Sequence, residues 1–181
     1  MKPLTFELIE RIANLLRQEA RLAGAELGLQ PIQQEVLHYL SRCNRYSDNP
    51  LAVAEYLGIT KGTLSQTLKV LENKGLIEKH KDEQDKRLIH LVLSDEGKRF
   101  TRQAIPPKLF SQALSKVNTN QLDTALTELL RHYQLKSDRL GFGVCRHCQH
   151  NQPGPHGFTC GLTGEPLKKR ELELLCREFA E

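Results

Sequence analysis

Apolar residues recur at steps of mostly three and four near the start of the chain, and no proline interrupts them between Thr5 and Leu29. Such steps place side chains on one face of an α-helix, so the pattern predicts a long amphipathic helix over residues 5–29. Its apolar face is formed by Phe6, Leu8, Ile9, Ile12, Leu15, Leu16, Ala20, Ala23 and Leu27. That face is wide for a helix at the start of a chain, and we expect part of it to pack outside the local fold.

The pattern then predicts a pair of helices joined by a glycine turn. Pro31 suits the first turn of a helix that ends in the polar residues 41–50. A short helix over residues 51–57 is followed by Gly58, and Thr60 is an N-cap residue type for a longer helix over residues 61–73.

In this longer helix the buried stripe should be Leu64, Leu68 and Leu71, and Gly75 should end it. The stripe leaves a row of hydrogen-bonding side chains towards solvent. These are Lys61, Thr63, Ser65, Gln66 and Lys69.

Two short runs with β-strand character follow, over residues 76–81 and 87–93, and predict a hairpin. Ser94 is positioned to cap a helix to about residue 105, which Pro106 and Pro107 interrupt. The last long helix is predicted over residues 119–135. The fold class is therefore mainly α with a small β-hairpin (α+β), a winged helix-turn-helix with long dimerising helices and a small C-terminal cysteine-rich module.

Composition excludes a membrane protein. Hydrophobic residues make up 39% and charged residues 27% of the 181 positions, and no apolar run approaches the roughly 20 residues that cross a bilayer. Charged residues at Glu7, Glu10 and Arg11 interrupt the start of the chain, which therefore does not resemble a secretory signal. We expect a cytoplasmic protein with no membrane partner. A net charge of +4 favours a polyanionic partner only weakly, so the distribution of the basic residues matters more.

The stretch from Leu51 to His80, with Asp85-Lys-Arg87 and the exit Leu91-Val-Leu-Ser-Asp-Glu-Gly97, resembles the MarR family of transcription regulators. The resemblance extends over roughly residues 6–135. It implies a homodimer held by interlocking terminal helices, double-stranded DNA with an inverted repeat as the partner, and a small-molecule effector that no residue here identifies.

Physical reasoning gives the same DNA-binding surface. A helix fits the major groove of B-DNA, where Lys61, Thr63, Ser65 and Gln66 can face base edges and Lys69 can meet a phosphate. We expect Gln66 to be the main base-reading residue. The resemblance assigns Asp85 to bracing Arg87 at the hairpin tip, which would reach the minor groove. Further positive charge comes from Lys79, Lys81 and Lys86.

Cysteines outside the ordinary MarR pattern gather near the C-terminus. Cys145 and Cys148 form a C-x-x-C pair, followed by Cys160 and Cys176, and four thiolates complete the ligand set of one metal centre. Tetrahedral Zn²⁺ is the first expectation, and a [4Fe-4S] cluster is the alternative. We expect Cys43 and the histidines His147, His150 and His156 to lie outside the set.

The predicted organisation is a winged helix and dimerisation domain over residues 1–136, a linker over 137–143 and a cysteine-rich module over 144–181, ending in a short helix over 168–179. The predicted function is a homodimeric, sequence-specific transcription regulator that responds to metal or redox state through its four-cysteine centre. One alternative is a winged-helix adaptor for protein partners, with structural zinc and no DNA affinity. A redox enzyme built on the cysteines is disfavoured, because no nucleophile-base pair, cofactor loop or paired carboxylate accompanies them.

Overall fold

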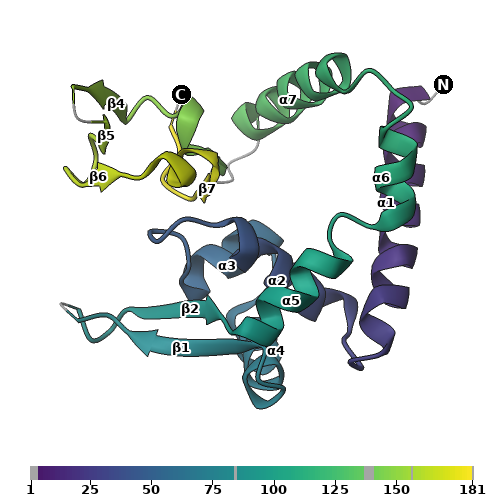
Figure 1. Cartoon of the computed structure of the whole chain (residues 1–181), viewed down its shortest axis with the longest axis horizontal. Helices are drawn as coiled ribbons and strands as arrows, with labels where there is room; N and C mark the ends of the chain where they lie inside the picture. Colours follow the sequence, from purple (N-terminus) through teal and green to yellow (C-terminus); the bar gives the residue numbers. More distant parts are fainter. Residues whose placement is uncertain (1–3, 84, 137–140, 156, 181) are drawn as a thin grey trace.

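The computed structural model describes residues 4–83, 85–136, 141–155 and 157–180. The described chain is mainly helical, and its strands are short and antiparallel (Figure 1). The helices are α1 (Leu4–Ala25), α2 (Pro31–Arg42), α3 (Pro50–Leu57), α4 (Lys61–Asn73), α5 (Asp95–Ala104), α6 (Lys108–Leu114) and α7 (Thr119–Lys136). The strands are β1 (Ile77–Lys81), β2 (Ile89–Leu93), β3 (Gly143–Val144), β4 (Asn151–Gly154), β5 (Gly157–Cys160), β6 (Pro166–Leu167) and β7 (Leu175–Cys176). The predicted fold class is confirmed.

The winged unit consists of α2 to α5 with the hairpin of β1 and β2. Its helices start where the sequence supplies caps: the Asn49 side chain accepts from Ala52 N at 3.0 Å, and Thr60 Oγ1 accepts from Thr63 N at 3.1 Å. Gly58 and Gly75 take left-handed backbone angles (φ +65° and +67°) and end α3 and α4. The core between the helices and the inner face of the hairpin includes Val36, Leu37, Val53, Leu71, Leu76, Ile77 and Leu91.

The start of α5 is pressed against the chain that enters β1. Ser94 caps α5 by accepting from Gly97 N at 3.1 Å, and its hydroxyl donates to the Gly75 carbonyl at 2.6 Å. A β-carbon at Gly97 would collide with the carbonyl oxygen of Leu76. Glycine is therefore required at this contact between α5 and the hairpin.

Helices α1, α6 and α7 extend away from the winged unit (Figure 1). Helix α6 lies beside α1, where Leu109 N donates to the Glu19 carboxylate at 3.2 Å. Among the described residues of these three helices only Gly24 is buried. The apolar stripes of α1 and α7 thus lie on the surface of the single chain.

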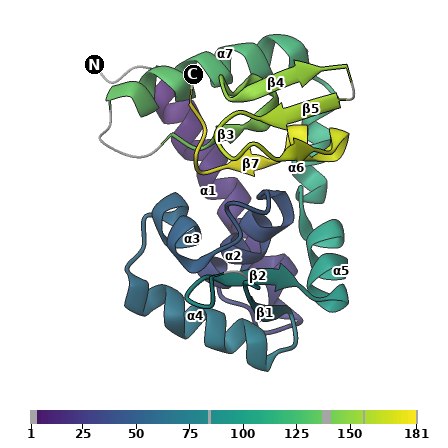
Figure 2. The same cartoon turned by 90° about the vertical axis from the view of Figure 1, so that its left-hand side faces the viewer.

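The cysteine-rich segment folds against the winged unit, near α2 and α3 (Figures 1 and 2). Strand β3 pairs with β7, and β4, β5 and β6 form a second small sheet. The helix predicted over residues 168–179 is wrong: a 3₁₀ turn, η2 (Lys169–Glu173), is followed by β7. The reason is tertiary, because the buried Leu175 packs into the core of the winged unit and its carbonyl accepts from Asn44 N at 2.9 Å.

The predicted linker is only partly described, since residues 137–140 lie outside the described ranges. Phe142, which follows them, is 8% exposed, and its ring lies 5.1 Å from that of Tyr56 and 6.3 Å from that of Tyr39. Phe142 therefore anchors the start of the cysteine-rich segment in the winged unit. None of the described helices combines the length and apolar character needed to cross a membrane.

Candidate DNA-binding surface and cysteine centre

Helix α4 presents the predicted polar residues to solvent. Lys61, Thr63, Ser65, Gln66 and Lys69 are all exposed, whereas Leu64, Leu68 and Leu71 are buried as the periodicity predicts. The hydroxyl of Thr63 is 2.9 Å from that of Thr60, so this side chain takes part in the helix cap.

The hairpin carries the predicted acid-arginine pair at its tip. Asp85 Oδ1 accepts from the Arg87 backbone N at 3.0 Å and from Arg87 Nε at 3.1 Å. These two hydrogen bonds hold the pKa of Asp85 below its ordinary value. The Arg87 side chain remains 92% exposed, so it is oriented by Asp85 and still open to a partner.

A groove of about 410 Å³ separates α4 from the hairpin. Lys61 and Ser65 line it from α4, and Lys79 and Ile89 line it from the hairpin. Lys79 pairs with Glu72 at 2.6 Å, which reduces its contribution to the positive charge of this surface. The exposed Lys86 lies next to Arg87 on the tip.

The sequence analysis missed a histidine that braces the hairpin. His90 on β2 lies 2.7 Å from Asp48 Oδ1 through Nδ1 and 3.2 Å from Asp82 Oδ2 through Nε2. Burial lowers the pKa of His90, but the hydrogen bonds and charges of the two aspartates outweigh it, and the pKa lies above its ordinary value. Leu91 N also donates to the Asp48 carbonyl at 2.7 Å. The α2–α3 loop, residues 43–49, is thereby attached to the wing.

The four predicted metal ligands lie together around one cavity. Cys145, Cys148, Cys160 and Cys176 all line a space of about 130 Å³. Burial, followed by the charges of the other three cysteines, raises the pKa of Cys145 to about 11. Among the described residues, no three or more His, Cys, Asp or Glu side chains lie close enough to hold a single metal ion. The four cysteines thus share the lining of one cavity with residues of the α2–α3 loop.

The remaining cysteine and histidines take different positions. Cys43 is half-buried and does not line the cavity, and burial raises its pKa to about 12. His147 is exposed, whereas His150 lines the cavity. His156 lies outside the described residues.

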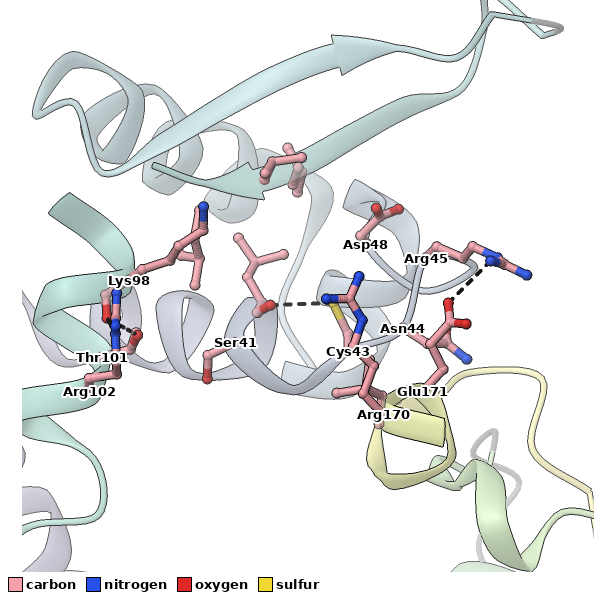
Figure 3. A pocket seen from close by; sticks show the side chains of 15 residues that line it. Ser41, Cys43, Asn44, Arg45, Asp48, Lys98, Thr101, Arg102, Arg170 and Glu171 are labelled. Carbon is pink, nitrogen blue, oxygen red and sulfur yellow. Dashed lines mark hydrogen bonds and ion pairs between the residues drawn. The ribbon is translucent and has the colours of Figure 1, made fainter. Parts of the chain in front are cut away.

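Residues of the α2–α3 loop hold the cysteine-rich segment in place. Arg45 pairs with Glu165 at 3.0 Å and with Glu171 at 3.2 Å, and Figure 3 shows it directed at Glu171 across the junction. On the other side Arg177 pairs with Glu55 of α3 through two guanidinium nitrogens. No local pattern pointed to these residues, because the partners lie more than 110 positions apart in the chain.

The α2–α3–α4 unit with its charged hairpin defines a winged helix-turn-helix protein. A sequence model of the MarR family matches residues 27–88. The transcriptional repressor MprA of Escherichia coli (strain K12) is 31% identical over 133 residues, covering 70% of this chain and 74% of MprA. The chain therefore belongs to the MarR family of transcription regulators, whose members are not enzymes.

Solved structures share the fold. The Q18P mutant of MepR from Staphylococcus aureus superposes with a TM-score of 0.61 at 23% identity, covering 74% of this chain and all of that one. A MepR-DNA complex gives 0.57 at 23% identity over 73% of this chain and 99% of that one. A MarR regulator from Methanosarcina mazei Go1 gives 0.59 at 20% identity over 75% and 99%.

Proposed function

We propose that the protein is a homodimeric, sequence-specific DNA-binding transcription regulator. The observation that carries the proposal is the exposed polar face of α4 beside a charged, braced hairpin. MepR, which shares the fold, has been crystallised with DNA. In the proposed complex α4 lies in the major groove, Gln66 faces base edges, Lys69 contacts a phosphate, and Arg87 reaches the adjacent minor groove.

The dimer is proposed from the apolar surface of the terminal helices. Side chains on α1 are exposed from Leu4 (72%) to Leu22 (74%), and on α7 Leu126 is 45% and Leu130 55% exposed. An apolar stripe of this extent is typical of an interface and not of a monomer surface. Two-fold protein symmetry requires an inverted repeat, with half-sites about one helical turn (~34 Å) apart.

The four cysteines are proposed to bind one metal centre, Zn²⁺ or an iron-sulfur cluster. The core of this segment itself contains few buried apolar residues, chiefly Leu167 and Leu172, because Phe142 and Leu175 are buried in the core of the winged unit. A bound centre would offset the conformational entropy that such a core leaves unmatched. Replacing each of the four by serine should lower metal content and raise protease sensitivity beyond residue 140, whereas Cys43→Ser should change neither.

A small-molecule effector has a candidate place at the junction shown in Figure 3. This cavity of about 470 Å³ lies between α5, β2 and η2, and Lys98, Arg102 and Arg170 line it. Arg45 also lines the cavity, and the two acids of the lining, Asp48 and Glu171, are paired with His90 and Arg45. The excess of positive charge favours an anionic ligand. Thermal shifts with a panel of aromatic and aliphatic carboxylates, repeated on Arg102→Ala, test this site.

Selection of bound duplexes from a random DNA pool tests the DNA-binding function. An inverted repeat should be enriched, and its affinity should fall steeply with salt. The rival function, a winged-helix adaptor for protein partners, predicts no enriched sequence and no binding at about 50 mM salt. If protein with full metal content enriches no sequence and binds no DNA at this salt concentration, the proposed DNA-binding function is wrong.

A further inference from the structure

We propose that the four cysteines hold a [4Fe-4S] cluster instead of a single Zn²⁺ ion, and that this cluster controls operator affinity through the α2–α3 loop. The inference rests on the proposed DNA-binding function and adds the identity of the centre and its route to the wing. Two separate observations carry it: the cavity that the four cysteines line, and the contacts of residues 43–49.

The cavity at the four cysteines favours the larger of the two kinds of centre. In a tetrahedral zinc site the Zn–S distance is about 2.3 Å, which places the sulfurs about 3.8 Å apart with no space between them. Here all four cysteines line a cavity of about 130 Å³, and no set of described side chains converges as one ion requires. A cavity of about 150 Å³ holds a molecule such as benzene, so the space suits a compact cluster with one thiolate at each iron.

The surroundings of the cavity also suit a cluster. The Cys176 thiol lies within hydrogen-bonding reach of the Asn44 and Ser47 side chains and of the backbone at Glu178. Hydrogen bonds to ligand sulfurs are one of the means by which proteins set the potential of an iron-sulfur cluster. Since Asn44 and Ser47 belong to the winged unit, the centre is partly built from the DNA-binding part of the chain.

The α2–α3 loop contacts the cysteine-rich segment on one side. Asn44 N donates to the Leu175 carbonyl at 2.9 Å, next to the ligand Cys176. Arg177 N, on the other side of Cys176, donates to Ser47 Oγ at 2.8 Å. Ser47 is fully buried, so this contact is shielded from water.

The same loop contacts the DNA-binding surface on its other side. Asp48 accepts from Leu91 N and pairs with His90, which fixes the base of the wing. Asn49 caps α3, the first helix of the helix-turn-helix. Only one residue, Asp48, therefore separates the buried contact at Ser47 from the cap of α3 at Asn49.

Loss of the cluster would free Cys176 and β7, and with them the only described backbone contact between Asn44 and the cysteine-rich segment. The wing would then lose part of its support before it meets DNA. We expect the loaded protein to bind its operator about tenfold more tightly than the empty protein, within the ~5–150-fold usual for coupled sites.

The first experiment determines the centre. Full-length protein is incubated without oxygen with sulfide and equal amounts of ferrous and ferric iron, which supply the charge of a [4Fe-4S]²⁺ core, or with Zn²⁺ alone. About four iron and four sulfide per chain, with visible absorbance, should be found, and each cysteine-to-serine variant of the set should lower them. Cys43→Ser and His150→Ala should load normally. Stoichiometric zinc without retained iron or sulfide overturns the cluster.

The second experiment tests the route by separating the segment from the winged unit. The double variant Arg45→Ala/Glu55→Ala removes the ion pairs to Glu165, Glu171 and Arg177 and leaves every cysteine in place. Arg99→Ala, which removes a surface pair to Glu96 on α5, is the matched control.

In the double variant the affinities of loaded and empty protein should become equal within about twofold, while the control keeps the tenfold difference. Equal affinities in the loaded and empty unmutated protein would overturn the route. If the protein incorporates iron and sulfide but binds DNA neither loaded nor empty, the proposed DNA-binding function fails. The proposal of a cluster is then unaffected. If the double variant keeps the full tenfold difference, the contacts between the cysteine-rich segment and the winged unit do not transmit the effect, and the proposed route is wrong.

Discussion

Replacing Gln66 by alanine should change which sequences the protein prefers more than how tightly it binds DNA in general. Gln66 lies five residues after the start of α4, about 7.5 Å along the helix axis, on the exposed face beside Ser65. A glutamine that reads an adenine edge discriminates by about 1 to 3 kcal/mol. In a dimer both half-sites lose this contact, so symmetric operators should lose about 2 to 6 kcal/mol of discrimination if the half-sites act independently.

Lys69 provides the contrast within the same helix. It lies three residues further along the exposed face, about 4.5 Å along the axis, and we expect it to meet a phosphate. Lys69→Ala should weaken binding to all duplexes alike and lower the slope of log K against log salt by about 0.9 per protomer, or about 1.8 per dimer. Lys116→Ala, an exposed lysine between α6 and α7, is the charge-matched control.

Fluorescence anisotropy over a salt series separates these effects. The operator from the random-pool selection is compared with symmetric variants changed at one base pair per half-site. If Gln66→Ala leaves the ranking of these variants unchanged while lowering the salt slope, the residue contacts the backbone and its assignment as a base reader is wrong. If Lys116→Ala gives the same slope change as Lys69→Ala, the effect is one of net charge.

Three further predictions concern the scaffold. Phe142→Ala should lower the free energy of unfolding by about 3 kcal/mol and the Tm by about 6 to 12 °C. This is the low end for a buried Phe, because the site lies at the edge of the core. A loss of under about 1 kcal/mol in calorimetry would contradict the packing of Phe142 on Tyr56. Because the pKa of His90 lies above its ordinary 6.5, its contribution to stability is complete below about pH 6.5 and lost as pH rises through the raised pKa. In urea unfolding at several pH values, the free energy of unfolding should therefore fall above pH 6.5 in the unmutated protein but not in His90→Gln. Identical pH profiles for the two proteins would show that His90 does not brace the hairpin. Leu126→Glu should convert the dimer to monomer in light scattering at micromolar concentration and weaken operator binding by at least tenfold; an intact dimer would exclude this face of α7 from the interface.

The sequence was sufficient for the parts of the fold that depend on local periodicity. The leucine stripe of α4, its cap at Thr60 and its end at Gly75 follow from spacing within one helix. The pairing of Asp85 with Arg87 was predicted from the resemblance to the MarR family, and the structure contains it. The number of cysteines near the C-terminus also predicted that the four would lie around one site, as they do. The sequence could not predict how far apart their sulfur atoms lie.

The sequence was not sufficient for contacts between distant segments. His90 and Asp48 are 42 positions apart, and Arg177 and Ser47 are 130 apart, so no periodic pattern links them. The same limitation explains the wrong helix over residues 168–179. Local propensity favoured a helix there, but the pairing of Cys176 with Gly143 and the burial of Leu175 outweigh it.

In the proposed dimer, the contact at Gly97 would help to set the distance between the two DNA-binding units. Helix α5 connects the hairpin to α6, which lies beside α1 (Figure 1). In its first turn, Gly97 lies so close to the Leu76 carbonyl that there is no room for a β-carbon. The angle between α5 and the hairpin is thus set mainly by a contact of backbone with backbone, with the Leu93 side chain beside it. A larger residue at position 97 would change the orientation of the hairpin relative to α5 and so alter the preferred number of base pairs between half-sites. The bases read within each half-site should stay the same.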